Sequence, residues 1–459
     1  MNVLTVDFGS TYTKLTAINA TDAIILGTAS AFTTIDTDII HGFNDALRIL
    51  EDKIGTFSYD RLLCCSSAGG GLKMVALGLV PELTAKAARL AASSAGAKVI
   101  KTYSFEISYS EQEEIYDINP DIVLLCGGTD GGNKEVIIAN AHRLCEIERD
   151  FTVIVAGNKS ASHQIKEIFE TQGKDYIITN NVMPTFNKLE IEPARKSIRE
   201  VFIKKIIEAK GLSEIQAMAS IDVIPTPSAV MAGCELLSKG TSKTLGIGDF
   251  MAVDLGGATT DIYSMSDGKP SMSNVLEKGL PEPFSKRTVE GDLGMRYSLN
   301  SLFDESDIDT MANELGIEKN DIIPWVKKCI ANPDTIAVSP DEQRIDGTFA
   351  QKAVEIAVER HCGFMESSYT PIGEVFTLTG KDLSEIEYII GIGGAIINSY
   401  HPPDILKGAL YNPQKPYILK PRHPKFLFDK KYIFASMGLL SNIDPELALY
   451  FMKKEIIIA

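Results

Sequence analysis

Two segments of the chain combine an aspartate with glycine and hydroxyl residues in the same order. Residues 4–16 read LTVDFGSTYTKLT, and residues 251–264 read MAVDLGGATTDIYS. Glycine lets backbone N–H groups approach a ligand closely, and the neighbouring hydroxyl side chains add further donors, a combination that suits phosphate oxygens. The expected donors are Gly9, Ser10, Thr11 and Thr13 in the first segment, and Gly256, Gly257, Thr259 and Thr260 in the second.

The aspartates of these segments, Asp7 and Asp254, would repel a phosphate by themselves. Their position beside phosphate donors therefore implies a cation. Mg²⁺ keeps several of its waters when it binds to proteins and phosphates. We expect both carboxylates to hold Mg²⁺ through water.

The elements that position these residues are predicted to be two β-hairpins. An apolar run precedes each aspartate, and a second apolar run follows the glycine turn. For a single copy, an ordinary strand–turn–strand with a solvated aspartate is an equally good interpretation. The presence of two copies, each opening a long α/β segment, favours ligand binding. Two such hairpins would bind the phosphates of a nucleotide from both sides.

Length and composition restrict the class of protein. A chain of 459 residues is expected to form two or three domains. Its 45 Lys+Arg against 61 Asp+Glu give a net charge of −16, which argues against a nucleic-acid surface. The seven cysteines form no Cys-x-x-Cys, and the six histidines are scattered, so no zinc site is indicated. We expect no membrane segment and a cytoplasmic protein, because neither a signal sequence nor a run of 18 apolar residues occurs.

A regular alternation of strands and helices is predicted between residues 98 and 182. Such alternation indicates a parallel sheet covered by helices, inserted into the first part of the chain. Its loop CGGTDGGN, residues 126–133, follows a strand and precedes a helix, where doubly wound sheets bind ligands. A plain tight turn is an equally good interpretation of this loop. The expected strands are 98–103, 121–126, 151–156 and 176–179.

The second half of the chain holds three further features. Residues 286–296, KRTVEGDLGMR, are dense in charge and glycine and are expected to form a loop before a helix. Residues 304–341 form a predicted helical excursion that contains the only tryptophan, Trp325. Residues 387–398 predict a buried strand leading into a helix through Gly391, Gly393 and Gly394, where a flat ring could lie against the backbone.

Four motifs in this order resemble the superfamily of actin, the sugar kinases and the heat-shock chaperone ATPases. They are the two aspartate hairpins, the small-residue segment PTPSAVMAG at 225–233 and the glycine segment at 391–394. The resemblance implies an α/β fold with two ribonuclease-H-like lobes. We expect residues 1–95 to begin lobe I, 96–185 to form a swivelling, B12-domain-like insert, 186–245 to complete lobe I with a crossing helix, and 246–459 to form lobe II.

A closer resemblance is to the MutL family of glutamate mutase accessory proteins. It rests on DFGSTYTK at 7–14, GGTDGGN at 127–133, NVMP at 181–184, the charged segment 286–296 and the segment 432–440. The resemblance implies an ATP-driven reactivating factor, which helps a coenzyme-B12-dependent mutase exchange damaged cobalamin for adenosylcobalamin. It implies ATP and Mg²⁺ as cofactors and a mutase as the protein partner. The position of the insert between elements of lobe I predicts that the insert contacts that mutase.

Carried over by position, the resemblance also implies roles for individual residues. Asp254 or Asp261 would orient the attacking water, and Lys14 with Mg²⁺ would stabilise charge. The implied nucleotide-binding residues are Gly9, Ser10, Thr11, Tyr12, Thr13, Gly256, Gly257, Ala258, Thr259, Thr260, Gly391, Gly393 and Gly394. Two alternatives stay open, a small-molecule kinase of the same superfamily and a non-catalytic interaction protein that uses ATP as a latch.

Overall fold

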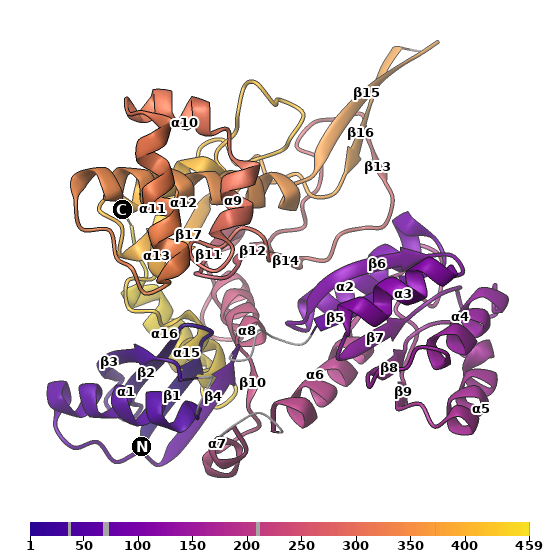
Figure 1. Ribbon diagram of the computed structural model, residues 1–459, viewed down its shortest axis with the longest axis horizontal. Helices are drawn as coiled ribbons and strands as arrows, with labels where there is room; N and C mark the ends of the chain where they lie inside the picture. The colour runs from indigo at the N-terminus through magenta and orange to yellow at the C-terminus, as the bar shows by residue number, and fades with distance from the viewer. Residues whose placement is uncertain (35–37, 68–72, 208–211, 372, 459) are drawn as a thin grey trace. The chain divides into compact units, whose positions relative to one another are not determined.

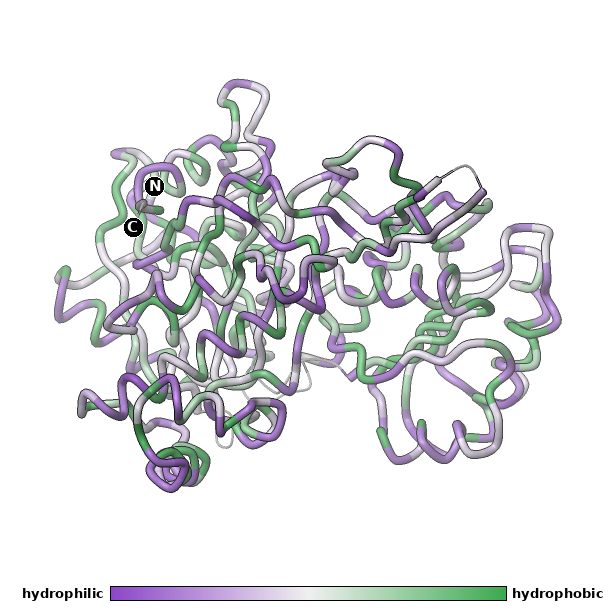
Figure 2. The backbone as a smooth tube through the Cα atoms, turned by 90° about the horizontal axis from the view of Figure 1, so that it is seen from above, coloured by the Kyte–Doolittle hydropathy of each residue, from purple (hydrophilic) through white to green (hydrophobic). Residues whose placement is uncertain are grey.

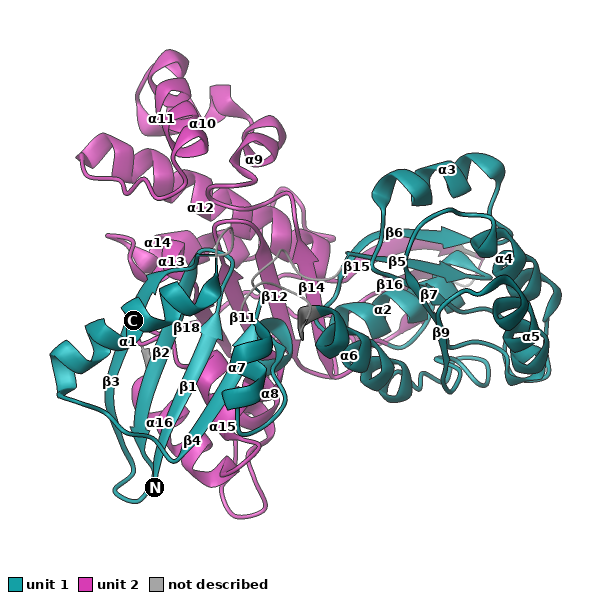
Figure 3. Ribbon diagram, turned by 60° about the horizontal axis from the view of Figure 1, so that its bottom comes forward, with its two compact units in different colours: residues 1–229, 279–281 teal, residues 230–278, 282–459 magenta. Residues whose placement is uncertain are grey.

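The computed structural model describes residues 1–34, 38–67, 73–207, 212–371 and 373–458. The chain divides into two compact units (Figure 3). The first unit comprises Met1–Ala229 and Gly279–Pro281, and the second comprises Val230–Lys278 and Glu282–Ala459.

The first unit opens with a five-stranded sheet in the order β10-β4-β1-β2-β3 (Figure 1). The strands are β1 (Asn2–Phe8), β2 (Tyr12–Asn19), β3 (Ile24–Phe32), β4 (Arg61–Ser66) and β10 (Ile224–Pro225). The first three strands are antiparallel neighbours, and β4 runs parallel to both β1 and β10. Helix α1 (Ile39–Ile54) packs on β2 and β3 with a buried face that includes Phe43, Ala46 and Leu50.

The second unit contains a sheet of the same plan, in the order β14-β12-β11-β17-β18-β19. Its strands are β11 (Phe250–Leu255), β12 (Thr260–Met265), β14 (Ser285–Glu290), β17 (Tyr388–Ile392), β18 (Lys425–Phe428) and β19 (Ile457–Ile458). Here too an antiparallel group of three, β14-β12-β11, is followed by two parallel strands, β17 and β18.

The shared strand order confirms the expected fold class. In both units the first strand lies in the middle, with its hairpin partner on one side and a parallel strand on the other. The fold is therefore α/β and actin-like, with duplicated ribonuclease-H-like lobes. The segment 286–296, however, was wrongly expected to be a loop throughout: its first part belongs to strand β14, where Lys286 and Arg287 are buried.

The inserted α/β part of the first unit is also present. Its five strands are all parallel, in the order β6-β5-β7-β8-β9. They are β5 (Lys73–Gly78), β6 (Lys98–Ser104), β7 (Ile122–Leu125), β8 (Thr152–Val155) and β9 (Tyr176–Ile178). The four strands predicted from the sequence correspond to β6–β9, and β5 was not predicted. Since β5 joins this sheet before residue 96, the boundaries of the insert remain a proposal.

Helices cover these sheets or connect them. In the first unit they are the π-helix Pro81–Ala85, α2 (Lys86–Ser94), α3 (Tyr109–Ile118), α4 (Glu135–Cys145), α5 (Ser162–Gln172), α6 (Glu192–Ile207) and α7 (Leu212–Met218). Helix α8 (Thr226–Lys239) runs from the first unit into the second. The second unit has α9 (Leu299–Glu305), α10 (Ile308–Leu315), α11 (Lys319–Ala331), α12 (Pro340–His361), α13 (Gly394–Ile397), α14 (Pro402–Leu406), α15 (Phe434–Leu440) and α16 (Pro445–Glu455).

Helices α10 and α11 confirm the predicted helical excursion around Trp325. A separate three-stranded sheet, β13 (Val275–Lys278), β16 (Gly373–Thr379) and β15 (Phe364–Thr370), also belongs to the second unit.

Each unit has its own hydrophobic core between its sheets and helices. Hydrophobic and hydrophilic residues are mixed along the backbone (Figure 2). In α1 the apolar residues Phe43, Ala46 and Leu50 recur at helical spacing and are buried. Among the described residues, none of the helices combines the length and the apolar character needed to cross a bilayer.

Candidate functional site

The two hairpins predicted from the sequence have the same register. In the first, Asp7 lies opposite Lys14, and in the second, Asp254 lies opposite Asp261. The tips close with the same hydrogen bond, since Gly9 N–H donates to the Tyr12 carbonyl at 3.1 Å and Gly256 N–H donates to the Thr259 carbonyl at 2.9 Å. The hairpins therefore correspond residue by residue from the aspartate onward.

Glycine is required at the first position of the first turn. A Cβ at Gly9 would lie 2.6 Å from the carbonyl oxygen of Tyr12, which is closer than real Cβ contacts. The equivalent distance from Gly256 to the Thr259 carbonyl oxygen would be 3.1 Å, a tight contact. The Asp-x-Gly order thus serves the turn as well as the ligand chemistry.

The backbone N–H groups at both tips are available to an anion. Within the described parts of the chain, the N–H groups of Ser10 and Thr11 have no hydrogen-bond acceptor, and neither do those of Gly257, Ala258 and Thr259. The five residues are only partly buried. Successive unpaired N–H groups in a turn form a concave anion-binding site, which suits a phosphate.

Asp7 is held in place by neighbours from three elements. Its Oδ1 accepts hydrogen bonds from the Thr226 hydroxyl at 2.6 Å and the Cys65 thiol at 3.5 Å, and the Lys14 Nζ lies 3.8 Å from its Oδ2. Burial, with the carboxylate of Asp7 adding to it, raises the pKa of the Cys65 thiol well above its usual range. The thiol therefore stays protonated and donates to Asp7.

Asp254 lies beside the glycine segment predicted to contact adenosine. Strands β11 and β17 are parallel neighbours, and Asp254 pairs with Ile392. Gly393 has a φ of 88°, and a Cβ there would lie 2.7 Å from Oδ1 of Asp254. Only glycine permits this approach. A Cβ at Gly391 would lie 3.0 Å from Cδ1 of Phe428, and the predicted contact of Gly391 with a nucleotide stays a prediction.

Asp261 is committed to a buried ion pair with Arg287 of β14. The Arg287 Nε donates to Oδ1 of Asp261 at 2.7 Å, and the Thr259 hydroxyl donates to Oδ2 at 3.0 Å. Burial alone would lower the pKa of Arg287, but the carboxylate of Asp261 outweighs it and leaves that pKa above its ordinary value. Asp261 is therefore held by two structural contacts, and which aspartate would orient a water molecule stays a prediction.

Three of the side chains expected to bind the nucleotide make contacts within the protein. The Thr13 hydroxyl is buried and hydrogen-bonded to that of Thr33 at 3.1 Å, and the buried Thr260 hydroxyl donates to the carbonyl of Leu293. The Tyr12 ring contacts that of Phe32 edge to face. A direct contact of these side chains with a nucleotide stays a prediction.

The described residues contain no group of three or more histidine, cysteine or carboxylate side chains that could hold a metal directly. Two separate aspartates with oxygen donors fit Mg²⁺ that is bound through water and phosphate. They do not fit a metal ion held by protein ligands alone.

The glycine loop at 126–133 is fixed by two buried asparagines. The Asn158 side chain accepts from the Gly131 N–H and donates to the carbonyls of Gly132 and Asn133, each at 3.0 Å. The Asn181 amide donates to Gly128 and Asp130. These hydrogen bonds favour the interpretation of the loop as a tight structural turn.

Sequence reasoning missed two partners of the site aspartates, Thr226 and Arg287. Thr226 lies in the small-residue segment 225–233, in which the sequence predicted no site residue. Arg287 follows Lys286 in the charged segment, and both residues are buried in β14, so no alternation in the sequence signalled that Arg287 faces the core.

Comparisons with known proteins agree over the whole chain. The sequence model of the MutL protein family matches residues 3–456. Protein MutL of Clostridium tetanomorphum is 46% identical over 456 residues, which cover 99% of this chain and 99% of that protein. The chain belongs to the MutL family.

Solved structures resemble this MutL-family chain more distantly. The ethanolamine utilization protein EutJ from Carboxydothermus hydrogenoformans is 11% identical, covers 98% of this chain with 90% of its own, and gives a TM-score of 0.29. A glycerol dehydratase reactivase is 10% identical, the match covers 96% of this chain and 99% of that chain, and the TM-score is 0.35. Xylulose kinase from Lactobacillus acidophilus is 9% identical, the match covers 100% of this chain and 92% of that chain, and the TM-score is 0.35.

Proposed function

We propose that this chain is an ATP-dependent, chaperone-like reactivating factor for a coenzyme-B12-dependent mutase, either glutamate mutase or an aminomutase. It would use ATP hydrolysis to exchange damaged cobalamin for adenosylcobalamin. Membership of the MutL family supports the choice of client, since the motifs of the sequence resemble a family of mutase accessory proteins.

The observation that carries the proposal is the shared register of the two hairpins. Each hairpin offers an aspartate, a glycine turn and unpaired N–H groups at equivalent positions. This duplication suits a ligand with several phosphates better than a single anion. We therefore propose that both hairpins bind the phosphates of one ATP.

Different residues of the chain would have different roles in ATP hydrolysis. Ser10, Thr11, Gly257, Ala258 and Thr259 would donate backbone hydrogen bonds to phosphate oxygens. Asp254 would orient the attacking water, and the positive charge of Lys14 would stabilise the leaving phosphates. Mg²⁺, held through water by Asp7 and Asp254, would neutralise charge on the phosphates.

The conformational output would reach the client through the inserted sheet β5–β9. If the insert binds the mutase, adding the mutase to the chain should slow hydrogen exchange in the helices of the insert. Equal exchange rates there with and without the mutase would contradict that part of the proposal.

The test of ATP hydrolysis is phosphate release with no acceptor added. The wild-type chain should release phosphate, and both Asp7→Asn and Asp254→Asn should abolish the release. Asp45→Asn and Asp267→Asn, which change exposed aspartates in the first and second units, should leave it intact. Turnover that requires a small-molecule acceptor would instead identify a kinase, and binding of ATP without turnover would identify a latch.

A further inference from the structure

The segment that follows β14 lies against the carbonyl side of the second phosphate turn. Its backbone and one side chain donate four hydrogen bonds to that turn. They are Met295 N–H to Gly256 at 3.1 Å, Arg296 N–H to Gly257 at 2.8 Å, Tyr297 N–H to Gly257 at 2.9 Å, and the Ser298 hydroxyl to Ala258 at 2.8 Å. A Cβ at Gly294 would lie 2.5 Å from the carbonyl oxygen of Ala258, so the two segments are in direct backbone contact.

These hydrogen bonds fix the direction of the donors in the turn. In a planar trans peptide the C=O and the following N–H point in opposite directions. Holding the carbonyls of Gly256, Gly257 and Ala258 on one side therefore directs the N–H groups of Gly257, Ala258 and Thr259 to the other side. Those three N–H groups lack acceptors among the described residues.

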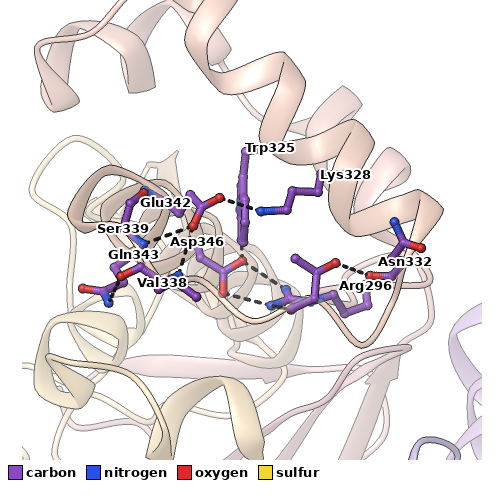
Figure 4. A network of polar contacts seen from close by, with 10 residues as sticks. Arg296, Trp325, Lys328, Asn332, Val338, Ser339, Glu342, Gln343 and Asp346 are labelled. Carbon is purple, nitrogen blue, oxygen red and sulfur yellow. Dashed lines mark hydrogen bonds and ion pairs between the residues drawn. The ribbon is translucent and has the colours of Figure 1, made fainter.

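The segment itself is anchored by the side chain of Arg296 (Figure 4). The Arg296 guanidinium binds both carboxylate oxygens of Asp346 on α12, at 3.0 and 3.2 Å. It also donates twice to the carbonyl of Thr335, between α11 and α12, at 3.2 and 3.0 Å, and once to its own neighbour Met295 at 2.6 Å. The guanidinium is mostly buried, with 15% of the side chain exposed.

The same carboxylate contacts the only tryptophan of the chain. The Trp325 indole N–H on α11 donates to Oδ1 of Asp346 at 3.3 Å, and the ring is buried (Figure 4). A displacement of Arg296 would change the charge next to the indole. Trp325 is therefore placed to report on the segment that supports the turn.

The structure assigns Arg296 the role of a positioning residue, which holds the N–H donors of the second phosphate turn and links this turn to α11 and α12. The assignment rests on the proposed function for its meaning in catalysis, because ATP is the ligand that the turn is proposed to bind. Two arginine contacts on a carboxylate give a fixed geometry that lysine does not reproduce.

Hydrogen exchange tests the assignment without a nucleotide. In Arg296→Met, amide exchange in a peptide covering residues 293–298 should be faster than in the wild-type chain, because the N–H groups of residues 295–297 would lose their hydrogen bonds to the turn. Asp346→Asn should give a smaller change in the same direction. The matched control is Lys328→Gln, which breaks an ion pair between α11 and α12 beside Trp325 but does not contact Arg296. Unchanged exchange in a folded Arg296→Met chain would overturn the assignment.

Kinetics and fluorescence test the link to the ligand. Arg296→Met should lower kcat for phosphate release by about 100-fold, as expected for a misplaced set of donors, and change KM much less. Added ATP should shift Trp325 emission in the wild type and in Lys328→Gln, but not in Arg296→Met. An ATP-induced shift retained in Arg296→Met would refute the link.

The two proposals fail separately. A wild-type chain that binds no ATP, together with faster exchange of residues 293–298 in Arg296→Met, would refute the proposed function and support the assignment of Arg296. If the wild type hydrolyses ATP, and Arg296→Met has the same kcat and the same exchange rates as the wild type, the proposed function is supported and the assignment of Arg296 is refuted.

Discussion

The buried pair of Asp261 and Arg287 gives the sharpest distinction between a catalytic and a structural aspartate. The two residues are 8% and 5% exposed, the Arg287 Nε donates to Oδ1 of Asp261 at 2.7 Å, and Nη2 of Arg287 lies 2.5 Å from the same oxygen. Removing one partner of such a pair leaves an uncompensated buried charge, which costs about 3–5 kcal/mol. Asp261→Asn keeps an acceptor oxygen beside Arg287, so we expect a loss near the lower end, about 3 kcal/mol.

Arg287→Met should cost as much or more, because it leaves the carboxylate of Asp261 alone. The double variant Asp261→Asn/Arg287→Met removes both charges and should recover a large part of the loss. We expect a coupling energy of about 2 kcal/mol between the two positions, within the range found for residues in contact.

Urea unfolding followed by Trp325 fluorescence measures these losses, since the only tryptophan is buried in the same unit as the pair. Far-UV circular dichroism of each variant checks that the chain is folded before urea is added. If Asp261→Asn has wild-type stability and yet releases no phosphate, the structural interpretation is refuted and Asp261 orients the water.

Two further predictions concern the second unit. Burial lowers the pKa of Lys381 to about 7, so between pH 7 and about 10 the unfolded chain binds more protons and stability rises with pH. The unfolding free energy of the wild type minus that of Lys381→Met should therefore grow by about 1.4 kcal/mol per pH unit in this range. A difference that does not change with pH would contradict the lowered pKa of Lys381. Gly393→Ala should abolish ATP binding measured by calorimetry, because its Cβ would meet Asp254 at a positive φ. The control is Gly347→Ala on α12, where a Cβ meets no atom within 4 Å; it should stabilise the chain by about 0.5–1 kcal/mol. If both variants bind ATP equally well, Gly393 is not needed for ATP binding.

The hairpins could be predicted from the sequence because all their determinants are local. An apolar run, an aspartate, a glycine turn and a second apolar run specify the strands and the turn, and the register of Asp7 with Lys14 follows from the length of the turn. Because the same pattern recurs around Asp254, the sequence also predicted that the fold is duplicated.

Strand β5 could not be predicted because nothing local specifies it. Its sequence, KMVALG, is a short apolar run that suits a strand or a helix equally well. Its strand partners begin at Lys98 and Ile122, so only the assembled sheet decides its conformation.

The partners of the site residues were missed for the same reason. Arg287 lies 26 positions from Asp261, and Thr226 lies 219 positions from Asp7. A charged run is usually solvated, and only the pairing of β12 with β14 shows that Arg287 points into the unit. The sequence therefore proposes which residues carry the site chemistry, and the structure adds the residues that hold Asp7 and Asp261 in place.

The central proposal is tested most directly by reactivation of a poisoned mutase. A B12-dependent mutase inactivated with hydroxocobalamin should regain activity when the chain, ATP, Mg²⁺ and adenosylcobalamin are added together. Replacing the chain with Asp254→Asn should prevent recovery, and Asp267→Asn should allow it. Recovery that is equally fast with Asp254→Asn, or without ATP, would contradict an ATP-driven reactivating factor.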